Sequence, residues 1–84
     1  MQLSDYFPQE HFIKLQGLDP HFVGRIILFK ANRGFDVEID IVQSETGKIY
    51  NHVRSLYNQE EPREALDSAV QYLKDYLHNK ANML

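Results

Sequence analysis

The stretch Phe22–Tyr57, FVGRIILFKANRGFDVEIDIVQSETGKIYNHVRSLY, decides the fold of this chain of 84 residues. It contains three segments rich in β-branched and aromatic residues, at 22–31, 35–44 and 48–56, which is the composition of β-strands. The two polar connections between them end in Gly34 and Gly47, and glycine suits the left-handed last position of a three-residue hairpin loop. The stretch therefore predicts three antiparallel strands joined by two tight hairpins.

The strand predicted at 35–44 has the clearest pattern, because apolar and acidic residues alternate along it. The apolar set is Phe35, Val37, Ile39 and Ile41, and the acidic set is Asp36, Glu38 and Asp40. The strand predicted at 22–31 is apolar on both faces, so its orientation depends on the hairpin register. Three-residue loops place Ile27 and Phe29 on the core face of the sheet, and they place Ile26 and Leu28 on the outer face.

A helix pattern follows the sheet. Pro62 suits the first turn of a helix, and apolar residues then recur at helical spacing. They are Leu66, Ala69, Val70, Leu73 and Leu77. We therefore expect a helix over 62–79 that buries this stripe against the core face of the sheet.

The N-terminal segment, 1–21, has a weaker signal. It predicts either one helical turn or an extended arm before Pro8, and a short strand over Glu10–Gln16. The expected fold class is α+β: a three- or four-stranded antiparallel β-meander with one long C-terminal α-helix packed on one face. Residues 1–84 are expected to form a single domain, because the chain is too short for two.

Composition limits the classes of function. Nine Lys and Arg against twelve Asp and Glu give a formal net charge of −3, which provides no overall attraction to nucleic acid or to an anionic membrane. Cysteine is absent, so we expect a protein of the reducing cytoplasm without disulfides. No apolar run approaches the roughly 18–20 residues of a membrane helix, and Met1–Pro8 lacks the pattern of a signal peptide.

Residues for catalysis or metal binding do not group in the sequence. The histidines at 11, 21, 52 and 78 lack the close spacing of zinc sites. The acidic row Asp36, Glu38, Asp40 is spaced by about 7 Å along one strand, too widely to share an ion closely. The predicted register gives it Lys30, Arg54 and His52 as cross-strand partners. We therefore expect a solvated, charge-paired face, no cofactor, no metal and no enzymatic activity.

An apolar patch on the outer face is the best candidate for a binding surface. The predicted register exposes five residues there: Phe22, Ile26, Leu28, Val42 and Tyr50. A cluster of this kind is typical of a contact with a protein partner or with a second copy of the chain. The competing expectation is that the N-terminal segment folds over the patch. We therefore predict a protein-interaction or regulatory module that acts through the outer sheet face or through a sheet edge.

A basic cluster supports the alternative function. Lys30, Arg33 and Arg54 are expected to gather at one end of the sheet, where they would contact a nucleic-acid backbone. The acidic row on the same face opposes this function, so nucleic-acid binding is the second hypothesis.

Overall fold

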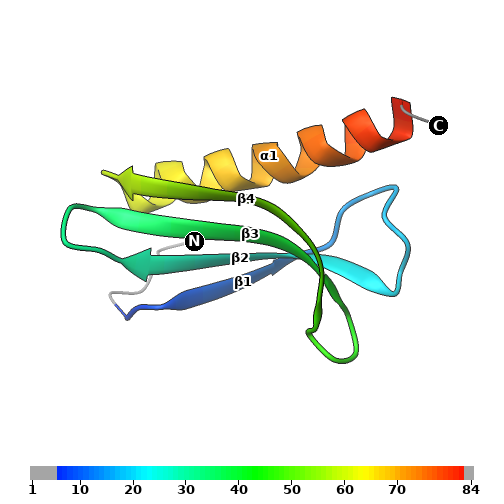
Figure 1. Cartoon of the computed structure of the whole chain (residues 1–84), viewed down its shortest axis with the longest axis horizontal. Helices are drawn as coiled ribbons and strands as arrows, with labels where there is room; N and C mark the ends of the chain where they lie inside the picture. Colours follow the sequence, from blue (N-terminus) through cyan, green and yellow to red (C-terminus); the bar gives the residue numbers. More distant parts are fainter. Residues whose placement is uncertain (1–5, 83–84) are drawn as a thin grey trace.

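The computed structural model describes residues 6–82, with side chains described through Asn79. It contains one sheet of four antiparallel strands in the order β1-β2-β3-β4, followed by one helix (Figure 1). The elements are β1 (Gln9–Ile13), β2 (Phe22–Lys30), β3 (Phe35–Gln43), β4 (Ile49–Gln59) and α1 (Pro62–Asn82). The α+β prediction is confirmed, and the sheet is the four-stranded meander. Within the described residues, no helix has the length and apolar character that crossing a bilayer requires.

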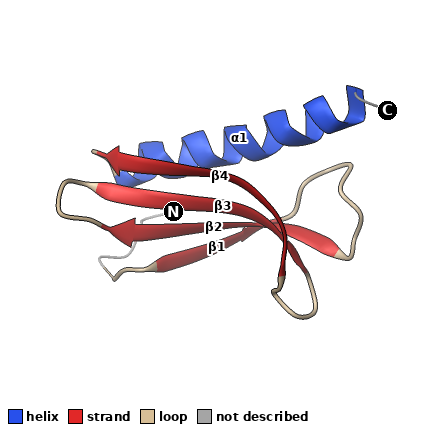
Figure 2. Ribbon diagram, viewed as in Figure 1, coloured by secondary structure: helices blue, strands red, loops and turns tan. Residues whose placement is uncertain are grey.

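Helix α1 covers one face of the sheet (Figure 2). It begins at Pro62 as predicted, and its stripe of Ala65, Ala69 and Leu73 is fully buried. The stripe packs against side chains of β2 and β3, and together they form the core: Ile26, Leu28, Val37, Ile39 and Ile41. Leu66, Val70 and Tyr76 pack around it partly buried. The core face predicted for β3 is therefore confirmed.

The N-terminal segment adds the edge strand β1. Its pairing with β2 places Phe12 opposite Arg25. Phe7, Ile13 and Leu15 are partly buried against the core that lies under α1, so they do not cover the opposite face of the sheet. The helical turn considered for the first residues falls mainly at 1–5, outside the described part of the chain.

The predicted register of the first hairpin is wrong by one residue. The Ala31 N–H donates a hydrogen bond to the Gly34 carbonyl at 3.0 Å, so the loop contains only Asn32 and Arg33. Lys30, and not Ala31, is paired with Phe35. Gly34 does have the predicted positive φ, +80°, but it lies directly before β3, where a Cβ would collide with the Gln59 carbonyl oxygen.

A shift of one residue turns every β2 side chain to the other face. Ile26 and Leu28 lie under α1, and Phe29 faces the other way. On this face Gly24 leaves room for Leu73, whose Cδ1 lies 2.8 Å from the ideal Cβ position of the glycine. A glycine inside a strand often marks such a close approach.

The second hairpin also differs from the prediction. Gln43 donates to the Lys48 carbonyl at 2.9 Å, which leaves a four-residue loop at 44–47. Farther along, Asp40 pairs with His52 as predicted, whereas Ile39 pairs with Arg54. Val53 therefore has no opposing residue and forms a β-bulge in β4.

The first testable prediction concerns the orientation of β2. Leu28 has an exposed fraction of 0%, against 38% for Phe29. We expect Leu28→Ala to lower the free energy of unfolding by about 2–5 kcal/mol, because it leaves a cavity in the core. Phe29→Ala should lower it by about 1 kcal/mol or less. Urea unfolding measures both values. A larger loss for Phe29→Ala than for Leu28→Ala would support the predicted register instead of the observed one.

The second testable prediction compares two glycines with similar backbone angles. Gly47 has a φ of +73° with open space around it, so Gly47→Ala should cost only the left-handed conformation, about 1–2 kcal/mol. Gly34→Ala must also displace the backbone of Gln59, which should add about 1–3 kcal/mol. Equal losses in urea unfolding would show that the backbones of Gly34 and Gln59 are not in close contact.

Candidate functional site

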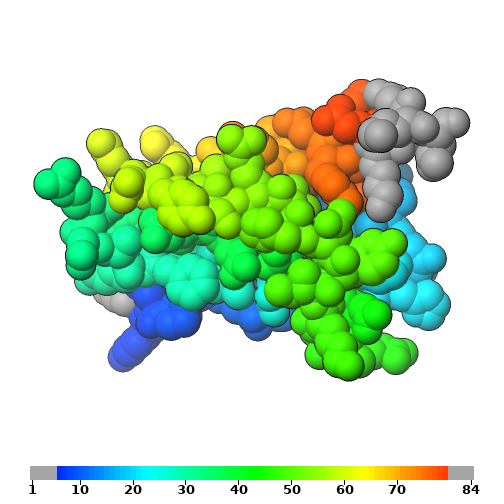
Figure 3. All heavy atoms as spheres, viewed as in Figure 1, coloured from blue at the N-terminus to red at the C-terminus, as the bar shows by residue number. Residues whose placement is uncertain are grey.

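The sheet face opposite α1 carries the candidate site. We call it the helix-free face, and it holds the residues that alternate with Ile26 and Leu28 in β2 and with Val37 and Ile39 in β3. In the space-filling view, the strands, coloured blue to yellow-green, occupy most of the side turned to the viewer, and α1 follows its upper edge (Figure 3).

A polar network crosses this face from β1 to β4. It consists of Glu10, Arg25, Glu38, Asp40, His52 and Ser55. Its centre is Asp40, whose exposed fraction is 0%. Arg25 lies beside it on β2, with Nη2 3.4 Å from Asp40 Oδ2 and Nη1 3.8 Å from Glu10 Oε2. Because an ionised carboxylate is costly to bury without a partner, Arg25 is essential to this arrangement.

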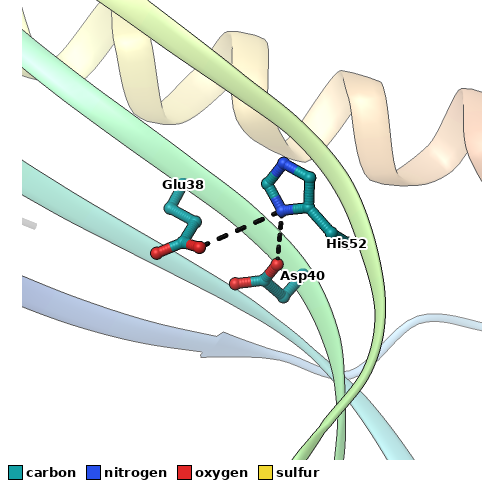
Figure 4. A group of neighbouring side chains, drawn as sticks. All are labelled: Glu38, Asp40 and His52. Carbon is teal, nitrogen blue, oxygen red and sulfur yellow. Dashed lines mark hydrogen bonds and ion pairs between the residues drawn. The ribbon is translucent and has the colours of Figure 1, made fainter.

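His52 approaches Asp40 from β4. Its Nδ1 lies 2.7 Å from Asp40 Oδ1 and 4.0 Å from Glu38 Oε1, while its Nε2 lies 3.2 Å from Ser55 Oγ. Figure 4 shows the two carboxylates and the imidazole converging from β3 and β4, on the side of the sheet away from the helix. The ligand atoms of Glu38, Asp40 and His52 all lie within 4.8 Å of one another.

The bulge at Val53 makes this grouping possible. In a regular strand, residues 52 and 55 would point to opposite faces, because side chains alternate. The extra residue reverses the alternation, so His52 pairs with Asp40 and Ser55 pairs with Glu38 on the same face. Bulges are common beside functional sites because they redirect a side chain in this way.

The network contains more negative than positive charge. Glu10, Glu38 and Asp40 supply three carboxylates, and Arg25 supplies one guanidinium. A neutral His52 leaves an excess of two negative charges, and a protonated His52 leaves one. The ion pair of Arg25 with Asp40 is a single long contact, and Arg25 Nε is buried without a hydrogen-bond partner in the described structure. The site is therefore suited to a positively charged ligand.

The order of contacts Asp40, His52, Ser55 is also that of a nucleophilic serine and its base. Such chemistry needs a hollow that holds a substrate beside the serine. Three hollows in the described chain lie elsewhere, and one of them, of about 500 Å³, lies between the β1–β2 loop and α1. None of these three includes Asp40, His52 or Ser55.

The apolar patch predicted for the outer face is not formed. Ile26 and Leu28 are buried under α1, and Val42 is buried on the helix-free face, each with an exposed fraction of 0%. Only Phe22 and Tyr50 retain exposed surface, and their rings contact each other with centroids 4.4 Å apart. The prediction for Ile26 and Leu28 was wrong because it depended on the register of the first hairpin.

The predicted basic cluster is also not formed. Lys30 and Arg33 lie at the β2–β3 hairpin, whereas Arg54 pairs with Ile39, four residues or about 13 Å farther along β3. The Arg54 guanidinium lies over the ring of Tyr72 on α1, 4.6 Å from its centroid. The nucleic-acid hypothesis loses this basis and stays an untested prediction.

Three members of the network were missed in the sequence: Glu10, Arg25 and Ser55. Glu10 had no signal, because the pairing of β1 with β2 was not predicted. Arg25 interrupts an apolar strand, and a charge within such a strand is a signal that a buried partner exists. Ser55 had no signal, because its position depends on the bulge. The pair of Asp40 with His52 was predicted and is confirmed.

Comparison with known proteins provides no further assignment, because no protein-family model, curated protein or solved structure matches the chain at a significant level. The candidate functions therefore depend on the geometry of the site.

The third testable prediction concerns the stability of the network. Arg25→Met leaves the Asp40 carboxylate buried beside His52 alone, and we expect the free energy of unfolding to fall by about 3–5 kcal/mol. The double variant Arg25→Met/Asp40→Leu should recover most of this loss, because it replaces the pair by apolar groups. Arg33→Met, in the exposed hairpin, is the control and should change stability by about 0.5 kcal/mol at most. A similar loss in both arginine variants would contradict a specific role for Arg25.

Proposed function

We propose that this protein is a non-enzymatic protein-interaction module, and that its helix-free face binds a partner segment that combines apolar and basic side chains. The observation that supports this function is the position of exposed apolar groups beside an acidic centre on the one sheet face that the helix leaves uncovered.

The apolar part of this surface is a strip at the β1–β2 edge, formed by Phe12, Ile27 and Phe29. Phe12 is paired with Arg25, so it lies diagonally beside Ile27, and Phe29 follows Ile27 on the same face. Phe12 has an exposed fraction of 56%, although it is a large aromatic residue. Exposed apolar groups along one face of a sheet are typical of contact surfaces.

The acidic part determines the kind of partner. Ile27 is paired with Glu38, and Phe29 is paired with Asp36, so both β2 members of the strip have a carboxylate beside them. A partner with Lys or Arg next to Phe, Leu or Ile matches both features. A second copy in face-to-face contact would instead bring its own acidic residues near this centre, and like charges at an interface are costly.

The sheet edges offer a second route to contact. β1 and β4 are the two edge strands, and the eleven-residue β4 has a free side. The pairing of β3 with β4 contains register shifts at three places, and irregular edges disfavour the regular addition of another strand. The face is therefore the preferred surface.

The fourth testable prediction uses a random peptide library displayed on phage and selected against the full chain. We expect the selected peptides to be enriched in Lys or Arg adjacent to aromatic or aliphatic residues. Phe29→Asp and Glu38→Lys should each weaken binding of the best peptide by at least about tenfold, as measured by isothermal titration calorimetry.

The matched control is Ser68→Asp, which adds the same charge as Phe29→Asp at an exposed position of α1. It should leave the affinity unchanged. Selected peptides without basic residues, or peptides that bind the Phe29→Asp variant equally well, would contradict the proposal. If light scattering shows a dimer and Phe29→Asp dissociates it, the partner of this face is a second copy of the chain and not a basic segment.

A further inference from the structure

The acidic centre also has the composition of a metal site. We propose that Glu38, Asp40 and His52 bind one Zn²⁺ ion, with Oε1, Oδ1 and Nδ1 as the ligand atoms. This inference does not depend on the peptide partner proposed above.

The donor set indicates the type of ion. One imidazole nitrogen and two carboxylate oxygens are ligands that zinc accepts in a tetrahedral site, with water in the fourth position. Mg²⁺ and Ca²⁺ prefer sites made of oxygen alone, usually with six or more ligands. The imidazole therefore favours zinc.

The geometry requires the Glu38 carboxylate to move closer to the other two ligands, because the three ligand atoms lie within 4.8 Å of one another. Bonds of about 2.0–2.2 Å in a tetrahedral site place ligand atoms about 3.3 Å apart. The separation of His52 Nδ1 from Asp40 Oδ1 is 2.7 Å, and its separation from Glu38 Oε1 is 4.0 Å. The distance from Nδ1 to Asp40 Oδ1 therefore has to increase slightly, and the distance from Nδ1 to Glu38 Oε1 has to decrease. Glu38 is able to move because its side chain is partly exposed, whereas the buried Asp40 provides a fixed ligand.

Ser55 is placed to orient His52 as a metal ligand. His52 Nδ1 lies 2.7 Å from the Asp40 carboxylate, which only accepts hydrogen bonds, so Nδ1 carries the proton of this contact when zinc is not bound. Zn²⁺ takes the place of that proton, and Ser55 Oγ, 3.2 Å from Nε2, then accepts the proton of Nε2. Metal-binding histidines commonly have such a partner on the second ring nitrogen, which fixes the tautomer and the ring orientation.

The charge of the network supports a divalent ion. With neutral His52, the three carboxylates and Arg25 leave an excess of two negative charges, and one Zn²⁺ neutralises it. Arg25 remains on the other oxygen of Asp40, Oδ2, so it does not occupy the ligand atom Oδ1.

The fifth testable prediction is measured by isothermal titration of ZnCl₂ into the full chain after treatment with a chelator. We expect one ion per chain. Glu38→Gln and His52→Ala should each lower the affinity at least tenfold, and Ser55→Ala should lower it about tenfold without changing the stoichiometry. Two-bond nitrogen–proton NMR spectra of the imidazoles should show zinc on Nδ1 of His52 and the proton on Nε2.

The matched control is His21→Ala, because this histidine is exposed and the hydrogen bond to Asp19 involves its backbone N–H. Its affinity for zinc should equal that of the unchanged chain. Circular dichroism has to show that each variant retains its helix, and Glu38→Gln provides a test that preserves shape if His52→Ala unfolds.

Equal zinc binding by the Glu38→Gln variant, or a loss in His21→Ala as large as in His52→Ala, would overturn the site and indicate adventitious binding to surface histidines. If Ser55 reacted with a fluorophosphonate while zinc did not bind, the network would be a nucleophilic site instead.

Discussion

The packing of α1 on the sheet determines every other feature of this protein. Ala65, Ala69 and Leu73 bury their side chains against one face, and the small alanines bring the helix close to the strands. Leu73 packs against the backbone at Gly24, on the same face as the buried Ile26 and Leu28 of β2. Because alternate residues point to opposite faces, this contact also leaves Arg25, Ile27 and Phe29 on the helix-free face. The composition of the candidate site follows from the packing of the core.

Most of the fold could be predicted from the sequence, and the reason is the alternation in β3. Only one orientation of β3 buries its apolar residues, because Val37 and Ile39 alternate with carboxylates. The core face of this strand and its contact with α1 were therefore predicted correctly. β2 offers no such distinction, because Ile26 and Ile27 are equally apolar. Its orientation depended on the length of a loop, which glycine alone does not determine. Gly34 has positive φ as expected but is needed for the close approach of Gln59.

The candidate site was harder to predict than the fold, because it depends on irregularities. The pair of Asp40 with His52 follows from regular pairing near the second hairpin and was found in the sequence. Glu38 shares the face of Asp40 through the regular alternation of β3, whereas Ser55 joins the group through the bulge at Val53, which no composition signal marks. The expectation of a solvated, charge-paired acidic row is confirmed for the pairing of Asp40 with His52. It is wrong in two respects: Asp40 is buried, and the other two expected partners, Lys30 and Arg54, are paired with Phe35 and Ile39. Distances along a strand separate the carboxylates, but a side chain from the neighbouring strand bridges them.

The two ligands proposed for the helix-free face depend on the same excess of negative charge, so they are coupled. A basic side chain of a partner and a zinc ion would both reduce the repulsion between Glu38 and Asp40. Once either has neutralised the site, the electrostatic gain left for the other is small, because Coulomb energy depends on the charge that remains. Thermodynamic linkage makes the effect reciprocal: zinc would weaken a basic partner by the same factor by which that partner weakens zinc. A partner held by the apolar strip of Phe12, Ile27 and Phe29 alone would escape this competition. The dependence of partner affinity on zinc therefore reports how much of the binding comes from charge and how much from the apolar strip.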